Sequence, residues 1–287
     1  MSEGVSTLPP ALGRALDRAA RALAAAGLPT PQREALRLAA DLFRSSPGEL
    51  ALRRGDPLAV ADHDRLDAAV RRRAAGEPAA YVTGVAGFRT LTLGIDPRAL
   101  IPRPETEGLV DRVLALSRTG VVVDVGTGSG CLALALRAEG GYRTVVGVDR
   151  SAAALELARE NGVRTGQPVA LVLGDLLGSL ETGSVDVIVS NPPYVSEGEH
   201  AQLDRSVRDY EPASALVGGS DGMEPTRRLL ADGLRAVRPG GWIALELAAE
   251  RAAIAAREAA ARGWTDIAVE DDLFGRPRYL LARRRPA

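Results

Sequence analysis

The hydrophobic positions of this chain follow one pattern before residue 78 and another after residue 100. In the first part, apolar residues recur every three or four positions, a spacing that places them on one face of a helix. The spacing predicts helices from Leu12 to Leu23, from Leu36 to Leu42 and from Val60 to Ala75. We therefore expect a small helical-bundle domain at residues 1–77.

Beyond residue 100, short apolar runs alternate with stretches of helical spacing. Buried strands are predicted at residues 121–125, 144–148, 169–173, 185–190 and 242–247, and two final strands at an antiparallel edge within 266–283. Helices are predicted at residues 131–138, 152–161, 225–237 and 250–262. This alternation is typical of an α/β fold with a doubly wound, mostly parallel, Rossmann-like sheet, here of seven strands.

The segment between the two patterns interleaves apolar residues with Gly84, Gly87 and Gly94. Such alternation favours a β-hairpin that links two domains. The predicted order is a helical domain at 1–77, a β-hairpin linker at 78–100 and an α/β domain at 101–287.

The charged residues narrow the chemistry that the chain supports. It has 36 basic and 37 acidic residues and a net charge of −1, so no global basic field favours a nucleic acid or a membrane. All the basic residues are arginine, which excludes Schiff-base, phosphate-loop and general-base chemistry by lysine. The run Arg71 to Arg73 at a predicted helix end has two interpretations: a solvated end that complements the helix dipole, or a patch for ribosomal RNA or an acidic partner.

Cysteine, histidine and aromatic residues are scarce. The single cysteine, Cys131, forms no intramolecular disulfide, and two histidines do not build a His-rich site, so we expect no metal. Aromatic residues are only 3%, too few for a stacking platform along single-stranded nucleic acid. No apolar run approaches membrane-spanning length and the first thirty residues lack a signal-peptide pattern, so we expect a cytoplasmic protein without a membrane partner. We also expect a monomer.

A glycine-rich turn follows the first predicted strand. Residues 121–130 read VVVDVGTGSG, so an apolar strand runs into Gly126, Gly128 and Gly130 before a helix begins. Ligands of a doubly wound sheet bind at the carboxyl ends of its strands, and glycines allow close approach of the backbone. The spacing fits the dinucleotide pattern poorly and lacks the Gly-Lys-Ser/Thr ending of a triphosphate loop. Asp124 is expected to hydrogen-bond the loop or an amino group of the bound ligand.

Carboxylates follow the next two predicted strands. Asp149 is placed to accept hydrogen bonds from a ribose diol, and Asp175 with Leu176 suits an adenine amino group and its ring. The alternative is a turn that uses glycine only for geometry, with Asp149 capping a helix at Ser151. The ordered set resembles class I S-adenosylmethionine-dependent methyltransferases. This resemblance implies S-adenosyl-L-methionine as cofactor, S-adenosyl-L-homocysteine as product, and as cofactor-binding residues Gly126, Thr127, Gly128, Ser129, Gly130, Asp149, Asp175, Leu176 and Asn191.

The sequence SNPPY, at residues 190–194, stands at the end of the fourth predicted strand. A planar nitrogen is a poor methyl acceptor because its lone pair is delocalised, so it must be aligned with the methyl group while its hydrogens are held. Asn191 offers a side-chain carbonyl, Pro192 a backbone carbonyl and Tyr194 a ring. These three are the predicted catalytic residues, which act by orientation rather than by a strong base. The alternative is a proline-rich turn that merely ends a strand.

Three further segments resemble the release-factor glutamine methyltransferases, the PrmC/HemK family. They are residues 73–84 with Phe88, the sequence LIPRPETE at 100–107, and residues 210–222. The resemblance covers nearly the whole chain and implies that the acceptor is the glutamine side-chain amide of the Gly-Gly-Gln motif in peptide chain release factors. It further implies a substrate-docking role for the helical domain. The implied substrate-binding residues are Asn191, Pro192, Pro193, Tyr194, Arg103 and Glu105, although an internal ion pair is an equal interpretation of Arg103 and Glu105.

Other functions remain open at this stage. Family members often have a glycine and a glutamine after the glutamate of residues 245–250, where this chain reads LELAAE, so no role is assigned there. A ribosomal-protein glutamine methyltransferase usually carries a different sequence at 104–107. A DNA or RNA methyltransferase that acts on an exocyclic amine shares the Asn-Pro-Pro-Tyr loop but needs a basic groove. A protein-binding module that keeps only the glycine turn is the non-enzymatic alternative.

Overall fold

The computed structural model describes residues 11–287, which form two compact units that divide between Val85 and Ala86. The first unit has one buried core, formed by residues between Leu12 and Val82. The second unit has two, formed by residues between 88 and 282. The division falls inside the segment that we predicted as a linker at 78–100. We describe each unit by itself.

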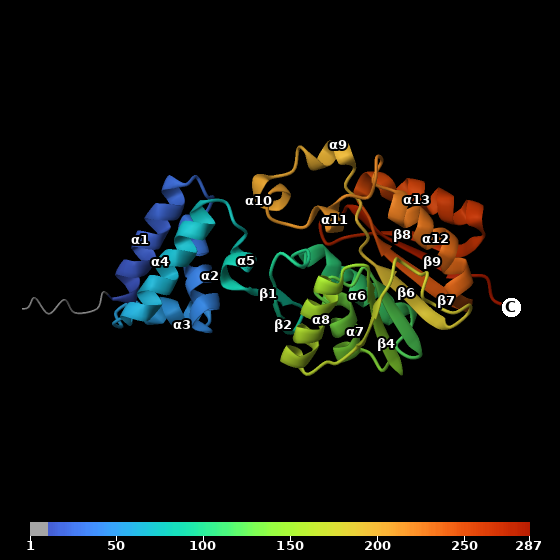
Figure 1. The fold of residues 1–287 in the computed structure, drawn as a ribbon, viewed down its shortest axis with the longest axis horizontal. Helices are drawn as coiled ribbons and strands as arrows, with labels where there is room; N and C mark the ends of the chain where they lie inside the picture. Colours follow the sequence, from blue (N-terminus) through green and yellow to red (C-terminus); the bar gives the residue numbers. More distant parts are fainter. Residues whose placement is uncertain (1–10) are drawn as a thin grey trace, which may run out of the picture. The chain divides into compact units, whose positions relative to one another are not determined.

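The first unit is helical (Figure 1). Its helices are α1 (Leu12–Ala25), α2 (Pro31–Phe43), α3 (Pro47–Leu52), α4 (Val60–Ala74) and α5 (Ala79–Thr83). The three longest were predicted because their apolar faces recur at helical spacing, and these faces bury Leu16, Leu23, Leu38 and Leu66 together. Helix α3 was not predicted, since six residues are too few for a period; a capping box between Ser46 and Glu49 begins it.

In this unit, residues 79–83 differ from the prediction, and two arginines of the run at 71–73 have ion-pair partners. Residues 79–83 are helical rather than the first part of a hairpin, because Pro78 starts and Gly84, at φ 73°, ends a single turn that buries Tyr81 and Val82. Arg72 and Arg73 form ion pairs with Glu77 and Glu34 of the same unit, at 2.5 and 2.7 Å. The arginine run is therefore not a patch of three free charges.

The second unit contains a seven-stranded sheet in the order β5-β4-β3-β6-β7-β9-β8. Strands β3 to β7 are parallel, whereas β9 lies antiparallel between β7 and β8. This confirms the predicted fold class and the antiparallel edge. The strands are β3 (Val121–Val125), β4 (Thr144–Asp149), β5 (Ala170–Leu173), β6 (Val185–Ser190), β7 (Val237–Glu246), β8 (Trp264–Asp271) and β9 (Pro277–Arg284).

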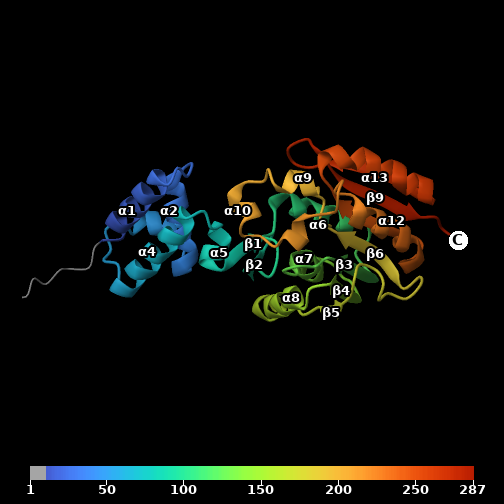
Figure 2. The same ribbon diagram turned by 45° about the horizontal axis from the view of Figure 1, so that its top comes forward.

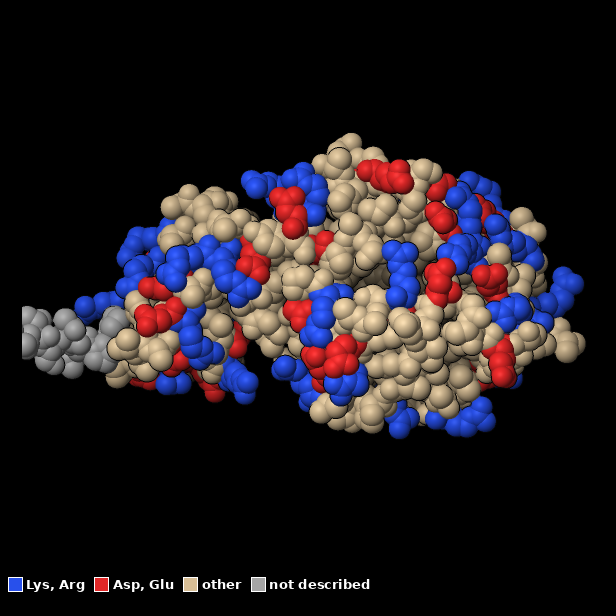
Figure 3. Space-filling view, in the orientation of Figure 1, with Lys and Arg blue, Asp and Glu red and all other residues tan. Residues whose placement is uncertain are grey.

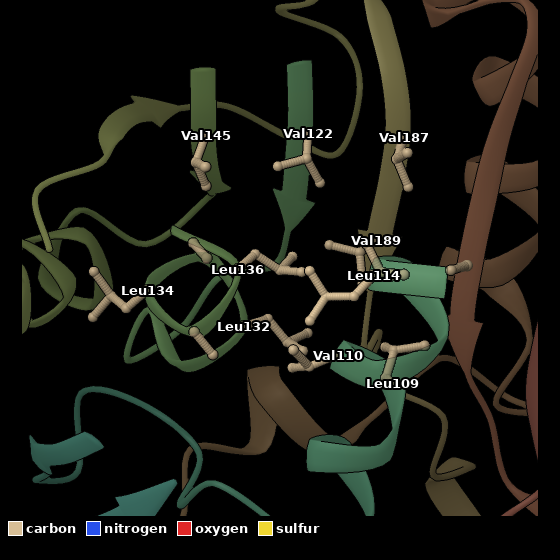
Figure 4. Close-up of a cluster of buried hydrophobic side chains, with 14 of the residues drawn as sticks. Leu109, Val110, Leu114, Val122, Leu132, Leu134, Leu136, Val145, Val187 and Val189 are labelled. Atoms are coloured by element: carbon tan, nitrogen blue, oxygen red, sulfur yellow. The ribbon is translucent and has the colours of Figure 1, made fainter. Parts of the chain in front are cut away.

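Helices cover both faces of the sheet (Figures 1 and 2). Alternate side chains of β3 enter different cores: Val122 packs with α6 (Pro104–Leu116) and α7 (Cys131–Glu139), and Val123 with α12 (Glu224–Ala236) and α13 (Ala249–Arg262). Figure 4 shows the leucines of α6 and α7 against valines of β3, β4 and β6. Helix α8 (Ala152–Thr165) packs beside α7, and the loops after β6 hold α9 (Glu197–His200), α10 (Arg205–Arg208) and α11 (Ala213–Leu216).

The predicted hairpin is present as β1 (Val85–Phe88) and β2 (Leu91–Gly94). Phe88 and Leu93 are buried in the same core as α6 and α7. The side chain of Asn161 in α8 accepts a hydrogen bond from Gly94 N at 2.6 Å and donates to Gly94 O at 2.9 Å. From Ala86 onward, the hairpin therefore belongs to the α/β unit and is not a separate linker.

Candidate active site

A cavity of about 220 Å³ opens at the carboxyl ends of β3, β4, β5 and β6. The chain runs outward from β3 through β4 to β5 and then returns to β6 on the other side of β3, so the cavity lies where the winding direction reverses. Of the predicted site residues, those that line it are Arg103, Gly126, Thr127, Gly128, Ser129, Asp149, Asp175, Leu176, Asn191 and Pro193. Glu105, Gly130, Pro192 and Tyr194 are not among its lining residues.

The glycine loop supplies an open backbone surface to the cavity. Gly126, Gly128 and Gly130 have φ of 74°, 54° and 84°, a left-handed region that favours glycine. A Cβ at Gly126 would meet nothing within 4 Å, so a ligand is free to approach there. A Cβ at Gly130 would lie 3.2 Å from Ala158 and Leu134, so glycine at this position permits the close packing of α7 and α8.

Asp124 holds the loop from behind. Its carboxylate accepts hydrogen bonds from the Thr127 hydroxyl at 2.6 Å and from Ala133 N at 3.1 Å. Among residues 11–287 its other oxygen has no hydrogen-bond partner, and burial raises its pKa to about 7. Since Asp124 does not line the cavity, the structure supports the first of its two expected roles, as a support of the loop.

Asp149 forms the contact at the start of α8 that we weighed as its alternative role, and it keeps acceptor capacity at the cavity. One carboxylate oxygen accepts from Gly128 N at 2.9 Å and the other from Ser151 N at 2.9 Å, at the start of α8. It also lines the cavity. A carboxylate oxygen accepts more than one hydrogen bond, so both oxygens keep capacity for a ribose diol.

Asp175 and Leu176 form a further part of the cavity wall. Asp175 accepts a hydrogen bond from Arg228 Nη2 at 2.6 Å, and Arg228, on α12, also lines the cavity. Leu176 has φ of 50°, in the left-handed region that is unusual for a residue other than glycine. Nothing in the local sequence pointed to Arg228, because it comes from a helix more than fifty residues further along the chain.

The Asn-Pro-Pro-Tyr loop begins at the cavity and then leaves it. Asn191 Nδ2 donates to the Thr106 hydroxyl at 3.1 Å, and the Ser190 hydroxyl donates to Val125 O at 2.6 Å, which ties β6 to β3. Pro192 is buried, and burial raises the pKa of Tyr194 to about 12. The Tyr194 hydroxyl is therefore neutral at physiological pH and does not serve as a base.

Arg103 does form an internal ion pair, but its partner is not Glu105. Its Nη2 lies 2.6 Å from Glu211 Oε1, and the other oxygen of Glu211 accepts from Ile101 N at 3.0 Å. The Glu211 side chain is 1% exposed. Glu105 instead contributes its backbone carbonyl, which accepts from the Tyr279 hydroxyl at 2.5 Å. Arg103 thus lines the cavity and braces the wall through a residue that sequence reasoning missed, although Glu211 lies in a segment singled out for its family resemblance.

The charges around the cavity fit a zwitterionic rather than a polyanionic ligand. Of its four arginines, three are paired with carboxylates: Arg98 with Asp96 and Glu160, Arg103 with Glu211, and Arg228 with Asp175. Arginine and acidic side chains are also interspersed over the face of each unit drawn in Figure 3. The open glycine loop and the spare acceptors of Asp149 therefore fit S-adenosylmethionine, whose ribose and zwitterionic methionine moiety need such groups.

Other chemistry finds little support in this unit. Burial raises the pKa of the Cys131 thiol to about 12, so it is no thiolate nucleophile. No group of three or more His, Cys, Asp or Glu side chains in residues 11–287 is arranged to hold a metal ion. Within the same residues, every helix is too short or too polar to span a bilayer.

The fold and the site define a class I S-adenosylmethionine-dependent methyltransferase. A methyltransferase from Pyrococcus furiosus shares the fold, with a TM-score of 0.52 and 21% identity over 69% of this chain and 90% of that one. The family described as methyltransferase small domain matches residues 105–208, and the PrmC N-terminal domain matches residues 14–84.

The nearer relatives specify the family. The release factor glutamine methyltransferase of Mycolicibacterium smegmatis is 41% identical over 95% of this chain and 98% of its own length. That of Koribacter versatilis is 38% identical over the same shares of both chains. The chain belongs to the release factor glutamine methyltransferase family.

Proposed function

We propose that the protein transfers a methyl group from S-adenosylmethionine to the side-chain amide nitrogen of the glutamine in the Gly-Gly-Gln motif of peptide chain release factors. The observation that carries the proposal is the position of Asn191, a planar polar side chain in the same cavity as the glycine loop and Asp149. Family relatives of nearly full coverage carry the name of this activity. We further propose that the protein acts as a monomer in the cytoplasm.

The residues around Asn191 act by orientation. The cofactor supplies an electrophilic methyl group. We assign the side-chain carbonyl of Asn191, which lines the cavity, as the acceptor of one hydrogen of the glutamine amide. We assign the backbone carbonyl of Pro192, which follows Asn191 in the chain but does not itself line the cavity, as the acceptor of the other, so that the amide nitrogen is aligned for attack. A nitrogen–carbon bond forms as the sulfur–carbon bond breaks, and the nitrogen then loses a proton to solvent. The Tyr194 hydroxyl stays protonated and does not serve as the base.

One assay separates the candidate acceptors. Labelled cofactor is incubated with a release factor, with its Gly-Gly-Gln glutamine-to-alanine variant, with a ribosomal protein and with nucleic acid. We expect label on the wild-type release factor alone. Label on nucleic acid, or equal label on the alanine variant, would refute the proposed acceptor.

Asn191→Ala tests the role of the acceptor loop. We expect turnover to fall by at least a hundredfold while the cofactor Kd changes by less than threefold, because the alanine removes an acceptor for the substrate amide. Calorimetry that shows a comparable loss of cofactor affinity would make Asn191 mainly a cofactor ligand.

We also propose that the helical unit docks the release factor while the α/β unit transfers the methyl group. The two units have separate cores, so residues 86–287 retain theirs when the helical unit is removed. The shortened chain should bind cofactor normally and methylate a short Gly-Gly-Gln peptide, but should lose most activity toward the whole release factor. Unchanged activity toward the whole factor would exclude this division of roles.

A further inference from the structure

We propose that Glu246 is a positioning residue, which acts through the Thr106 hydroxyl to determine which end of the Asn191 amide faces the methyl acceptor. The inference rests on the proposed function and adds to it two residues that no part of the acceptor loop contains. They lie on α6 and at the end of β7, and meet Asn191 only in the folded protein.

The contact between Asn191 and Thr106 is the first observation. Asn191 Nδ2 donates a hydrogen bond to Thr106 Oγ1 at 3.1 Å. Thr106 is 2% exposed and lies in the first turn of α6, and both residues line the cavity. Because a planar amide carries nitrogen at one end and oxygen at the other, directing Nδ2 to Thr106 turns Oδ1 away from it.

Glu246 determines the direction of this hydrogen bond. Helix α6 packs against β7, and the interaction of the Thr106 hydroxyl with the Glu246 carboxylate favours the ionised form of that carboxylate. An ionised carboxylate only accepts hydrogen bonds, so we assign Glu246 as the acceptor of the Thr106 hydrogen. The Thr106 hydroxyl has a single hydrogen, which it therefore gives to Glu246. Its oxygen is left as an acceptor, so Asn191 must present its NH₂ group to Thr106 and not its oxygen.

The polarity matters because the proposed substrate is itself a primary amide. Its nitrogen carries two hydrogens, which need acceptors. If the Asn191 amide were reversed, two NH₂ groups would face each other and the substrate would be repelled or turned. A carboxylate one side chain behind the cavity wall thus sets the hydrogen-bond pattern inside the cavity.

The placement of Glu246 supports such a role. Ser190 pairs with Leu245 across β6 and β7, so Asn191 and Glu246 are the residues that directly follow this pair along the two chain segments. Glu246 is 1% exposed, and among the described residues its Oε2 has no hydrogen-bond partner. A buried, half-satisfied carboxylate is costly for stability and is not explained by packing of the sheet.

Protonation of Glu246 would release this constraint. The carboxylic acid would donate to Thr106, whose hydrogen would then be free to point to Asn191, so the reversed amide would be allowed. Burial raises the pKa of Glu246 to about 7. The titratable and charged groups around it are Arg278 and Tyr279 of β9, Arg103 and Glu105 at the start of α6, Tyr194 of the acceptor loop, and Cys131 of α7.

Two substitutions of Thr106 separate the hydroxyl from its shape. Thr106→Val keeps the volume and removes the hydroxyl, whereas Thr106→Ser keeps the hydroxyl and removes a methyl group. With release factor as substrate, we expect Thr106→Val to lower kcat at least tenfold with the cofactor Kd within twofold of wild type. Thr106→Ser should retain kcat within about threefold. Equal kcat for the two variants would overturn the proposal.

The pH dependence tests Glu246 itself. At saturating substrates, the kcat of the wild type should fall as the pH drops below about 7, and Glu246→Gln, which still accepts from Thr106, should lose this dependence. The side-chain NH₂ resonances of Asn191, assigned by their loss in Asn191→Asp, should titrate near pH 7 in the wild type and not in Glu246→Gln. An identical titration in both proteins would overturn the proposal.

The resonance measurement needs no substrate, so it keeps the two hypotheses apart. A wild-type protein that shows the titration but leaves the release factor unmethylated would refute the proposed function and leave the positioning role intact. Normal methylation without an effect of Thr106→Val would do the reverse.

Discussion

Replacing Asn161 by alanine tests how the hairpin, α8 and the cofactor loop are joined. The Asn161 side chain is fully buried. It accepts from Gly94 N at 2.6 Å and donates to Gly94 O and to Ser129 O, both at 2.9 Å. Alanine would leave all three backbone groups of the hairpin and the loop without this partner.

The size of the effect follows from these contacts. A neutral hydrogen bond contributes about 1 kcal/mol net, and a buried group left unsatisfied costs about 1–3 kcal/mol. Because water is expected to enter the space and satisfy part of the lost bonding, we expect the free energy of unfolding to fall by about 3–4 kcal/mol. The cofactor Kd should also rise, since Ser129 lines the cavity.

The measurement is urea unfolding together with calorimetric titration of S-adenosylmethionine. Val163→Ala is the control, because Val163 lies on the same helix and is 75% exposed. It should change the free energy of unfolding by less than about 0.5 kcal/mol. A loss below about 1 kcal/mol for Asn161→Ala, or an unchanged cofactor Kd, would refute the view that this side chain joins the hairpin to the site.

Three further outcomes follow from single residues. Gly126 and Gly166 have similar positive φ values, 74° and 69°, and a Cβ at either position would meet no atom within 4 Å. Gly126→Ala and Gly166→Ala should therefore each lower the free energy of unfolding in urea by about 1–2 kcal/mol. Only Gly126→Ala should also weaken cofactor binding by calorimetry; equal cofactor Kd values for the two variants would contradict this. Because burial raises the pKa of Asp124, the folded protein keeps a proton at pH values where the unfolded chain has lost it. The free energy of unfolding should therefore fall as the pH rises from 5 to 7, by up to about 1.4 kcal/mol per pH unit for this group. Asp124→Asn should flatten this slope, so parallel curves for the two proteins would argue against the assignment. Arg103→Ala removes the ion-pair partner of the buried Glu211 carboxylate and should lower the free energy of unfolding by about 2–3 kcal/mol. Adding Glu211→Gln to this variant should recover part of the loss. A double-mutant cycle that shows no coupling would exclude the ion pair as a support of the cavity wall.

The elements that were predicted correctly are those whose signal is local. Strands β3 and β6 are buried on both faces and therefore appear as continuous apolar runs, and the long helices repeat their apolar residues every three or four positions. Short helices lack a period, which is why α3, α5, α9, α10 and α11 were missed. Helix α6 was also missed, since its sequence was considered only as a family motif.

The predicted site residues divide in the same way. Gly126 and Asn191 directly follow a strand, Asp149 ends β4, and Asp175 lies two residues beyond β5. Parallel strands bring their carboxyl ends to one edge, so the meeting of these residues at the cavity was foreseeable. Gly130, Pro192, Tyr194 and Glu105 lie close by along the chain but do not line the cavity.

The sequence by itself determined the order of strands and helices, the left-handed glycine loop and the set of groups at the strand ends, because each depends on neighbouring residues. Only the tertiary structure decided which side chains support them. Thr106 reaches Asn191, Glu211 reaches Arg103 and Asn161 reaches Gly94 across 67 or more positions of the chain. Such contacts depend on how the helices pack against the sheet, and no local pattern encodes that packing.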